Sequence, residues 1–511
     1  MHRKWWTLLA VCVATFMLLL DITVVNVALP DINRQLHATF SELQWVVDAY
    51  ALMLASLVLT AGSLADRLGR RRVFAVGLGL FTVASLGCGL ATSAVALDVL
   101  RGAQGIGGAV MFATSLALLA QEFQGRERGT AFGVWGATIG GAVAVGPLVG
   151  GVLTEGLGWE WIFFVNVPIG IAAIFLTLTR LRETRDPDAA GIDWAGALTF
   201  SASLFLLVFG LIRANAEGWG SPLIVGCLGG SAVLMVLFLV VERRQERPML
   251  DLQLFRKPTF AGASIVAFCL SASMFAMFLY LTLYVQNILG YSPLEAGLRF
   301  LPITLVSFFV APVAGRLSAR LPVKGFLTVG LLMVGTGLLL MSGLTVRSDW
   351  TALLPGFIVA GAGIGMINPP LASTAIGVVP PARSGMASGI NNTFRQVGIA
   401  TGIAALGALF QARVETKVVD LLAATPAAGR SHLIGTLVAG GQADEALRTL
   451  PAPLRGVAAQ AAREGFISGL DEILVVAAAV AFAGAVLAFL LVRGRDFVAP
   501  GGPDTAPPAA A

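Results

Sequence analysis

Long uncharged apolar runs are the feature of this sequence that most restricts its fold. A helix needs roughly 20 apolar residues to cross the hydrocarbon core of a bilayer, and about fourteen such runs follow one another along the chain. Only 12% of the 511 residues are charged, against roughly 25% in soluble domains. A water-soluble fold could not cover this much apolar surface, so we predict an all-α integral membrane protein.

The 34 lysines and arginines are distributed unevenly between the two sides of the membrane. With a cytoplasmic amino terminus, most of them fall in loops on that side, including the run Arg70-Arg71-Arg72. The short loops of the opposite side hold only Arg34, Arg213 and Arg347. Because positively charged loops stay in the cytoplasm, we predict a multi-pass protein of the inner (cytoplasmic) membrane with both termini inside the cell.

An internal repeat divides the chain into two halves. The segment Gly62-Ser-Leu-Ala-Asp-Arg-Leu-Gly69 is echoed by Gly315-Arg-Leu-Ser-Ala-Arg-Leu-Pro322. Duplicated helical halves are typical of transporters, in which one half rocks against the other. We therefore predict four segments: a six-helix bundle in 1–180, two inserted helices with a basic cytoplasmic linker in 181–258, a second six-helix bundle in 259–498 with a long external loop at 413–469, and a disordered Pro/Ala-rich tail at 499–511.

The first copy of the repeat carries a charge that the second lacks. It combines a tight turn with an acid and several cations, contributed by Gly62, Asp66, Arg67, Gly69, Arg70 and Arg71. Asp66 can form a charge latch to a neighbouring helix end, whereas Ala319 stands in its place in the second copy. This loop resembles the signature between the second and third spans of the major facilitator superfamily. The resemblance implies two six-helix bundles, to which this chain adds two central helices.

Other stretches resemble the drug:proton antiporter branch of that superfamily, whose members have fourteen spans. They are Leu20 to Pro30, Leu97 to Gly108, Gly141 to Gly151 and Trp159 to Gly170. In the third stretch Gly146 and Gly150 place small residues four apart, which permits close helix contact, while Pro147 bends the axis. The resemblance associates this pattern with the direction of antiport.

Buried charge points to a mechanism. Asp21 and Arg101 lie within apolar runs, where a charge costs several kcal/mol unless it is paired or hydrated. Both lie roughly 10 Å below the outer ends of their spans, so we predict that they pair. In this pair Asp21 carries the proton and Arg101 tunes the affinity of Asp21 for it. The alternative is a static ion pair. The resemblance also implies a role in proton coupling for Arg101. Asp48, a turn from the outer face, is either a proton-access carboxylate or a solvated one.

Candidate substrate contacts lie on several predicted helices, at Asn26, Phe275, Phe278, Asn391 and Arg395. Aromatic side chains suit adaptable binding if they face a cavity, but they serve equally in core packing or lipid contact. Arg395 is near mid-membrane and either faces the cavity or hydrogen-bonds between the halves. The second half has few acids, which favours neutral or monocationic lipophiles over dications.

Several functions are excluded by what the sequence lacks. Its four lysines are never followed by Ser or Thr, as a phosphate-binding loop requires, and its three histidines are too scattered for a metal cluster. We therefore expect no enzyme activity, no cofactor or metal beyond the proton gradient, no nucleic acid partner and a monomer in the lipid bilayer. The predicted function is proton-coupled antiport that exports small hydrophobic or monocationic compounds, as in multidrug or antibiotic efflux. Alternatives are a proton-coupled solute symporter of the same fold or a dedicated exporter of one endogenous metabolite.

Overall fold

The structure is a computed structural model, and it describes residues 3–38, 40–123, 125–185, 193–245, 248–380, 383–439 and 450–497. The side chains of Asn26 and Pro147 are not among the described parts. Within these ranges the chain is helical, with turns between helices and no strand. The predicted tail at 499–511 lies outside the described residues.

The apolar runs form long helices because the backbone of a membrane span must satisfy its hydrogen bonds internally. In the described part, 13 helices are long and apolar enough to cross a membrane. α5 (Gly125–Leu157) is a further helix of 33 residues, of which Leu148–Leu157 is a shorter apolar stretch. With α5 the number agrees with the predicted fourteen.

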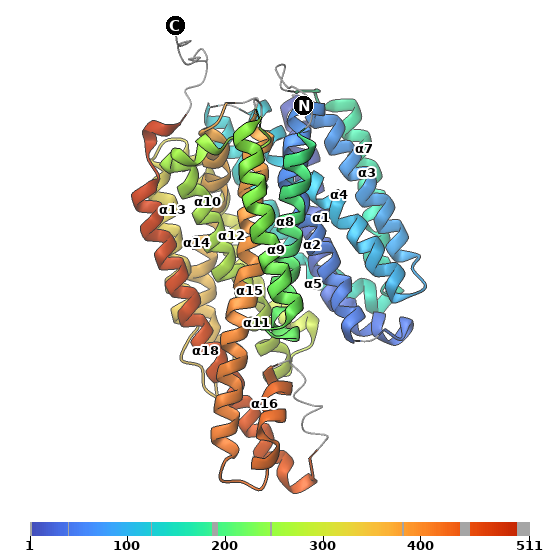
Figure 1. Ribbon diagram of the computed structural model, residues 1–511, viewed down its shortest axis with the longest axis vertical. Helices are drawn as coiled ribbons and strands as arrows, with labels where there is room; N and C mark the ends of the chain where they lie inside the picture. Colours follow the sequence, from blue (N-terminus) through green and yellow to red (C-terminus); the bar gives the residue numbers. More distant parts are fainter. Residues whose placement is uncertain are drawn as a thin grey trace.

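The helices of the first half run from α1 to α7 (Figure 1). Their bounds are α1 Arg3–Leu36, α2 Phe40–Leu68, α3 Arg70–Gly89, α4 Ala94–Glu122, α5, α6 Trp161–Phe164 and α7 Asn166–Arg180. The two inserted helices are α8 Trp194–Glu217 and α9 Pro222–Arg244, followed by the short η1 at Leu252–Arg256.

The second half begins with one span built of four segments, α10 Pro258–Leu270, η2 Ser271–Phe275, α11 Ala276–Leu283 and η3 Tyr284–Ile288. The segments η2 and η3 are π-helical. The remaining elements are α12 Pro293–Ser318, α13 Val323–Leu340, η4 Trp350–Leu353, α14 Leu354–Gly377, α15 Ser384–Leu422, η6 Ala428–Arg430, α16 Ser431–Ala439, α18 Ala452–Leu491 and η7 Gly494–Asp496.

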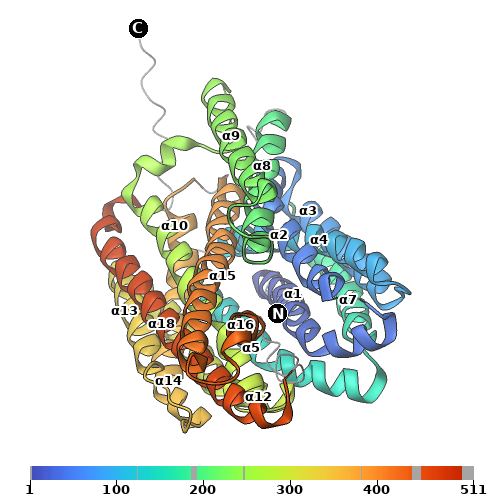
Figure 2. The same cartoon turned by 60° about the horizontal axis from the view of Figure 1, so that its bottom comes forward.

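The inserted helices lie at the seam between the halves rather than apart from them. α8 packs against α2 of the first half, α15 of the second half and α9 (Figure 2). Thr60 of α2 is hydrogen-bonded to Ser201 of α8 at 2.8 Å, and Asn215 of α8 donates to the carbonyl of Ala404 in α15 at 3.1 Å. α9 is peripheral, because large apolar side chains such as Val233 are exposed on it.

Both ends of the described chain lie at one end of the bundle, which we name the terminal face (Figure 1). There Asp496 accepts hydrogen bonds from the hydroxyl and amide of Thr259 at 2.7 and 3.2 Å. Burial opposes ionisation of Asp496, but these bonds and the charges of Arg495 and Arg493 hold its pKa below the ordinary value. The C-terminal end is thereby tied to the start of α10.

Helices α15 and α18 extend beyond the bundle at the opposite end, which we name the far face (Figure 1). They contain 39 and 40 residues, whereas about 20 suffice for a span. The predicted external loop at 413–469 therefore contains the end of α15, η6, α16 and the start of α18. Its residues 440–449 lie outside the described part.

Close glycine contacts join the two halves near the terminal face in a repeated way. A Cβ at Gly62 of α2 would overlap the carbonyl oxygen of Gly385 at the start of α15. In the second copy, a Cβ at Gly315 of α12 would overlap the carbonyl oxygen of Gly129 near the start of α5 and lie 2.9 Å from the Cα of Gly133. The sequence repeat therefore corresponds to two equivalent crossings between the halves.

Candidate functional site: a buried charge cluster and a latch between the halves

The two charges predicted to pair lie together in the first half. Arg101 of α4 donates from Nη1 to Oδ2 of Asp21 in α1 at 2.5 Å. Asp21 is 0% and Arg101 1% exposed. A buried ion pair of this kind is tolerated only with good geometry and further hydrogen bonds, because both ions have lost their water.

Neutral side chains supply those further hydrogen bonds. Gln104 and Asn166 donate to Oδ1 of Asp21 at 2.8 and 3.0 Å. Gln104 also accepts from Nη1 of Arg101 at 2.7 Å. Ser85 of α3 accepts from both amides and donates to the carbonyl of Phe163. Asp21 is therefore bound by one cation and two amides, from α4 and the start of α7.

The guanidinium of Arg101 is also fixed on its other side. Its Nε donates to the carbonyl of Val46 in α2 at 2.9 Å, and its Cζ lies 4.4 Å from the centre of the Tyr50 ring, within the range of a cation–π contact. Gly105 allows this approach, since a Cβ there would lie 2.5 Å from the carbonyl oxygen of Tyr50. The cluster thus connects α1, α2, α3, α4 and α7.

The small residues of α5 lie directly against α1 beside this cluster. A Cβ at Gly146 would overlap Oγ1 of Thr23, and one at Gly150 would lie 3.2 Å from the Cα of Val24. Thr23 is two residues from Asp21. Any larger side chain at Gly146 would displace the part of α1 that carries the buried acid.

Asp66 forms the contact between halves at the terminal face. Its Oδ1 and Oδ2 accept from the backbone amides of Gly385 and Met386 at 2.9 and 2.8 Å. Arg70 donates to the same Oδ1 from Nε and Nη2 at 2.9 and 2.6 Å. The carboxylate therefore caps the N-terminus of α15, where the helix dipole and free N–H groups favour an anion.

The rest of the loop positions Asp66 and begins α3. Gly69 has φ of 107°, a region that favours glycine. Glu183 accepts from the amides of Arg71 and Arg72 at 3.1 and 3.2 Å, so it caps the start of α3. Arg67 is half-buried at the end of α2.

The other predicted residues lie outside the charge cluster. Asp48 is half-buried on α2 and makes no hydrogen bond or ion pair with a described residue, although Arg213 of α8 acts on it electrostatically. Phe275 and Phe278 are half-buried on the π-helical span, with ring centres 6.2 Å apart. Asn391 and Arg395 lie on α15 and are 1% and 7% exposed.

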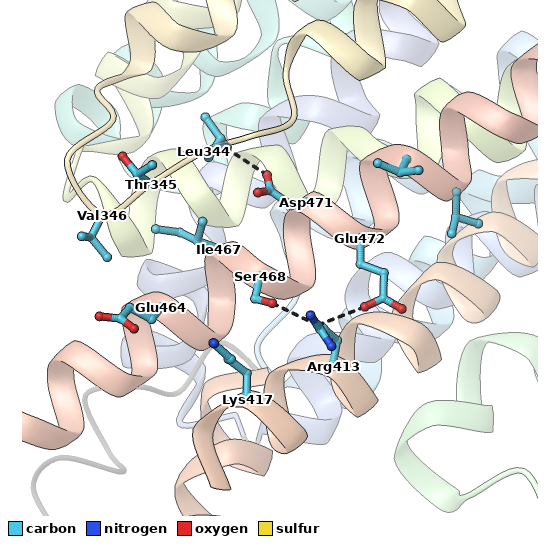
Figure 3. Close-up of a pocket in the computed structure, with 12 residues that line it drawn as sticks. Leu344, Thr345, Val346, Arg413, Lys417, Glu464, Ile467, Ser468, Asp471 and Glu472 are labelled. Atoms are coloured by element: carbon cyan, nitrogen blue, oxygen red, sulfur yellow. Dashed lines mark hydrogen bonds and ion pairs between the residues drawn. The ribbon is translucent and has the colours of Figure 1, made fainter. Parts of the chain in front are cut away.

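A hollow of about 700 Å³ opens at the far face, away from the charge cluster (Figure 3). It is lined by the loop after α13, by α15 and by α18. Arg413 pairs with Glu472 at 3.2 Å and donates to Ser468 at 3.0 Å, and Asp471 accepts from the amide of Leu344 at 3.2 Å. None of the site residues predicted from the sequence lines it.

Sequence reasoning missed the neutral partners of Asp21. Gln104 is three residues from Arg101, so helical spacing alone places both on one face of α4. Asn166 lies inside the stretch Trp159 to Gly170, in which the sequence shows only a resemblance to a family branch. Gly385 and Met386 donate to Asp66 from their backbone amides, and such partners leave no signal in side-chain patterns.

No group of three His, Cys, Asp or Glu side chains is arranged to hold a metal ion in the ranges that the structure describes. The polar groups of the site are ion pairs and amides. Such a cluster can take up and release protons and can hold helices in register.

Comparison with known proteins agrees with this architecture. The multidrug resistance protein Stp of Mycobacterium tuberculosis is 36% identical over 479 residues, which cover 93% of this chain and 89% of Stp. The tetracenomycin C resistance and export protein of Streptomyces glaucescens is 34% identical over 494 residues, or 95% and 91% of the two chains.

A solved structure supports the fold. The human organic anion transporter MFSD10 (TETRAN) superposes with a TM-score of 0.63 at 15% sequence identity, covering 96% of this chain and 100% of that one. The model of the Major Facilitator Superfamily matches residues 11–403. A repeat of two helical halves with a latch between them, together with these matches, identifies this multi-pass membrane protein as a member of the Major Facilitator Superfamily.

Proposed function

We propose that this protein is a proton-coupled antiporter that exports small hydrophobic or monocationic compounds across the cytoplasmic membrane by alternating access. The terminal face lies in the cytoplasm in this proposal, because the loops there carry most of the lysines and arginines. The protein acts as a monomer, uses the proton gradient in place of a cofactor, and catalyses no chemical reaction.

The buried Asp21 cluster is the observation that carries the proposal. An ionised Asp21 is held by Arg101, Gln104 and Asn166. Protonation would remove the charge that binds Arg101 and would leave a buried cation without its partner, which is strongly destabilising. The first half must then repack or admit water, so proton uptake can drive a change of conformation.

The latch supplies the second element of the proposed cycle. Asp66 holds the start of α15 against α2, so the state observed is closed between these helices at the terminal face. Substrate uptake from the cytoplasm requires this contact to open. Proton binding at Asp21 and opening at Asp66 act on different parts of the same helix, α2. The Asp21 cluster contacts α2 at Val46, near its start, and the latch lies at Asp66, near its end.

The names of the relatives support export as the direction. The two relatives described above are a multidrug resistance protein and a tetracenomycin C resistance and export protein, and a puromycin resistance protein of Streptomyces alboniger is 38% identical over 409 residues. The close packing of Gly146 and Gly150 on α1 places the stretch associated with antiport beside Asp21.

Efflux of a lipophilic fluorescent dye from energised cells, with an uncoupler control, tests the proposal. We expect Asp21→Asn to abolish proton-driven efflux, because the amide cannot release a proton. Asp31→Asn, at the end of the same helix, is the matched control and should retain efflux. Full proton-driven efflux in Asp21→Asn would remove Asp21 from the mechanism, and gradient-driven accumulation of the dye in the wild type would indicate a symporter.

A further inference from the structure

One face of α15 carries a polar stripe at the level of the bilayer interior. Ser388, Asn391, Asn392 and Arg395 follow one another at the spacing i, i+3, i+4, i+7, which places them on one side of the helix. They are 0%, 1%, 0% and 7% exposed. The charge cluster around Asp21 does not include them, and the proposed proton step makes no use of them.

Arg395 is a buried cation whose hydrogen-bond partners among the described residues are neutral. Its Nη2 donates to Oδ1 of Asn368 in α14 at 3.0 Å, and its Nε donates to Oδ1 of Asn391 at 3.4 Å. It makes no ion pair with a carboxylate of the described residues, unlike Arg101 and Arg70. An uncompensated charge within a span is expensive and marks a functional site by default.

The stripe also holds donors and acceptors without partners. Asn391 Nδ2, Asn392 Oδ1 and Ser388 Oγ have no hydrogen-bond partner among the described residues, although each is buried. Buried polar groups are normally satisfied, because leaving one unpaired costs about 1–3 kcal/mol. The free amide hydrogens of Asn391 and the charge of Arg395 belong to residues one turn apart, so one ligand oxygen could engage both.

The stripe lies where the two halves meet. Asn392 donates to the carbonyl of Phe112 in α4 of the first half at 3.4 Å. Asn368 precedes Pro369, whose ring would lie 3.1 Å from a Cβ at Gly136 of α5. In transporters built from two halves, substrate sites lie near the midplane at that boundary.

We propose that Arg395 and Asn391 form a subsite that binds an anionic oxygen of the exported compound, such as a carboxylate or phenolate. This inference rests on the proposed export function and shifts its substrate class from monocationic to acidic lipophiles. Acidic lipophiles are favoured over monocations, because a cation bound near Arg395 would face a buried like charge. Asn368 holds the guanidinium in position, and the aromatic and aliphatic surroundings bind the apolar part of the ligand.

The charge balance of the exchange shows whether an acid is carried as an anion. One proton entering against one monoanion leaving moves two positive charges inward. The same exchange moves one charge for a neutral compound and none for a monocation. Export of an acid should therefore respond most strongly to the membrane potential, since each charge moved across the membrane is driven by it.

Three related fluorescent probes test the subsite in proteoliposomes of the full chain. They are pyrenebutanoate, its neutral methyl ester and a pyrenebutyl-trimethylammonium cation. In the wild type we expect faster transport of the acid than of the cation, and a rate for the acid that rises with an imposed inside-negative potential. In Arg395→Gln we expect the rate for the acid to fall roughly tenfold, the worth of one lost charge-assisted hydrogen bond, while the rate for the ester changes less than about twofold.

Further variants separate binding from folding. Relative to Arg395→Gln, Arg395→Lys should restore part of the preference for the acid. Asn391→Ala should weaken that preference, although it leaves the charge of Arg395 in place. Arg299→Gln is the control, because it removes an arginine near the start of α12, at the far face. It should leave the preference for the acid unchanged. If Arg395→Gln does not fold, the preference for the acid measured in Asn391→Ala tests the subsite in its place.

The outcomes distinguish failure of the subsite from failure of the proposed function. Proton-dependent transport of all three probes with equal loss in Arg395→Gln would overturn the subsite and leave antiport intact. A wild type that prefers the cation would do the same. Proton-independent behaviour of every probe would overturn the proposed function itself.

Discussion

At the residue scale, the decisive feature is that the buried acid Asp21 is bound by neutral amides as well as by Arg101. Oδ1 accepts from Gln104 and Asn166 while Oδ2 accepts from Arg101. The amides hold the carboxylate in one orientation without adding charge. The depth of Asp21 and Arg101 in their spans predicts that the two charges pair, because both must avoid lipid. No argument from charge identifies a neutral partner.

The variant Gln104→Leu tests this arrangement. Leucine keeps the approximate volume of the glutamine side chain, but it can neither donate to Asp21 nor accept from Arg101. We therefore expect a loss of about 1–3 kcal/mol in the free energy of unfolding. Proton-driven efflux should fall at least about tenfold, since the pair loses its fixed geometry. Thermal unfolding of the purified protein and dye efflux measure the two effects. Gln411→Leu on α15 is the control, and equal behaviour of both variants would contradict the role of Gln104.

At the scale of elements, the two copies of the repeat differ in electrostatics rather than in packing. Gly62 against Gly385 and Gly315 against Gly129 are equivalent crossings. Only the first copy supplies an acid to the start of the facing helix, because Ala319 has no side-chain oxygen. The asymmetry could be predicted from the sequence, but the partner of Asp66 could not, because it is a pair of backbone amides.

Replacing the latch acid should shift the balance between conformations. Asp66→Asn keeps the shape but removes the anion from the N-terminus of α15 and removes the ion pair between Asp66 and Arg70, so we expect a loss of roughly 3 kcal/mol from the observed state. Distances between spin labels on α2 and α15 at the terminal face should lengthen. Arg72→Gln, which removes an exposed cation from the first turn of α3, serves as the control. An unchanged distance distribution in Asp66→Asn would exclude the latch.

At the scale of the whole molecule, the inserted helices α8 and α9 lie along one side of the seam between halves (Figure 2). α8 bonds to α2 through Ser201 and to α15 through Asn215. Rocking of one half must therefore slide α8 against at least one of them. The sequence predicts two extra apolar helices between the halves, but it contains no signal for where they pack.

Labelling of single cysteines tests the proposed orientation. In a variant without Cys12, Cys88, Cys227 and Cys269, a cysteine placed at Val346 on the far face should react with a membrane-impermeant maleimide on intact cells. A cysteine placed at Arg182 on the terminal face should react only after the cells are opened. Both positions are exposed in the structure. The reverse pattern would invert the orientation and remove the basis for export.

The sequence by itself determined the helical membrane fold and a number of spans of about fourteen, and it predicts two related halves and the pairing of buried acids and cations. These follow from local rules: apolar length, loop charge and the cost of a charge in lipid. Only the tertiary structure decided that Gln104 and Asn166 complete the site of Asp21, that Asp66 caps α15, and that the hydrogen bonds of Arg395 within the described part of the chain go to Asn368 and Asn391. Those contacts join residues as far as 320 positions apart, so they depend on how the helices pack, which no local pattern encodes.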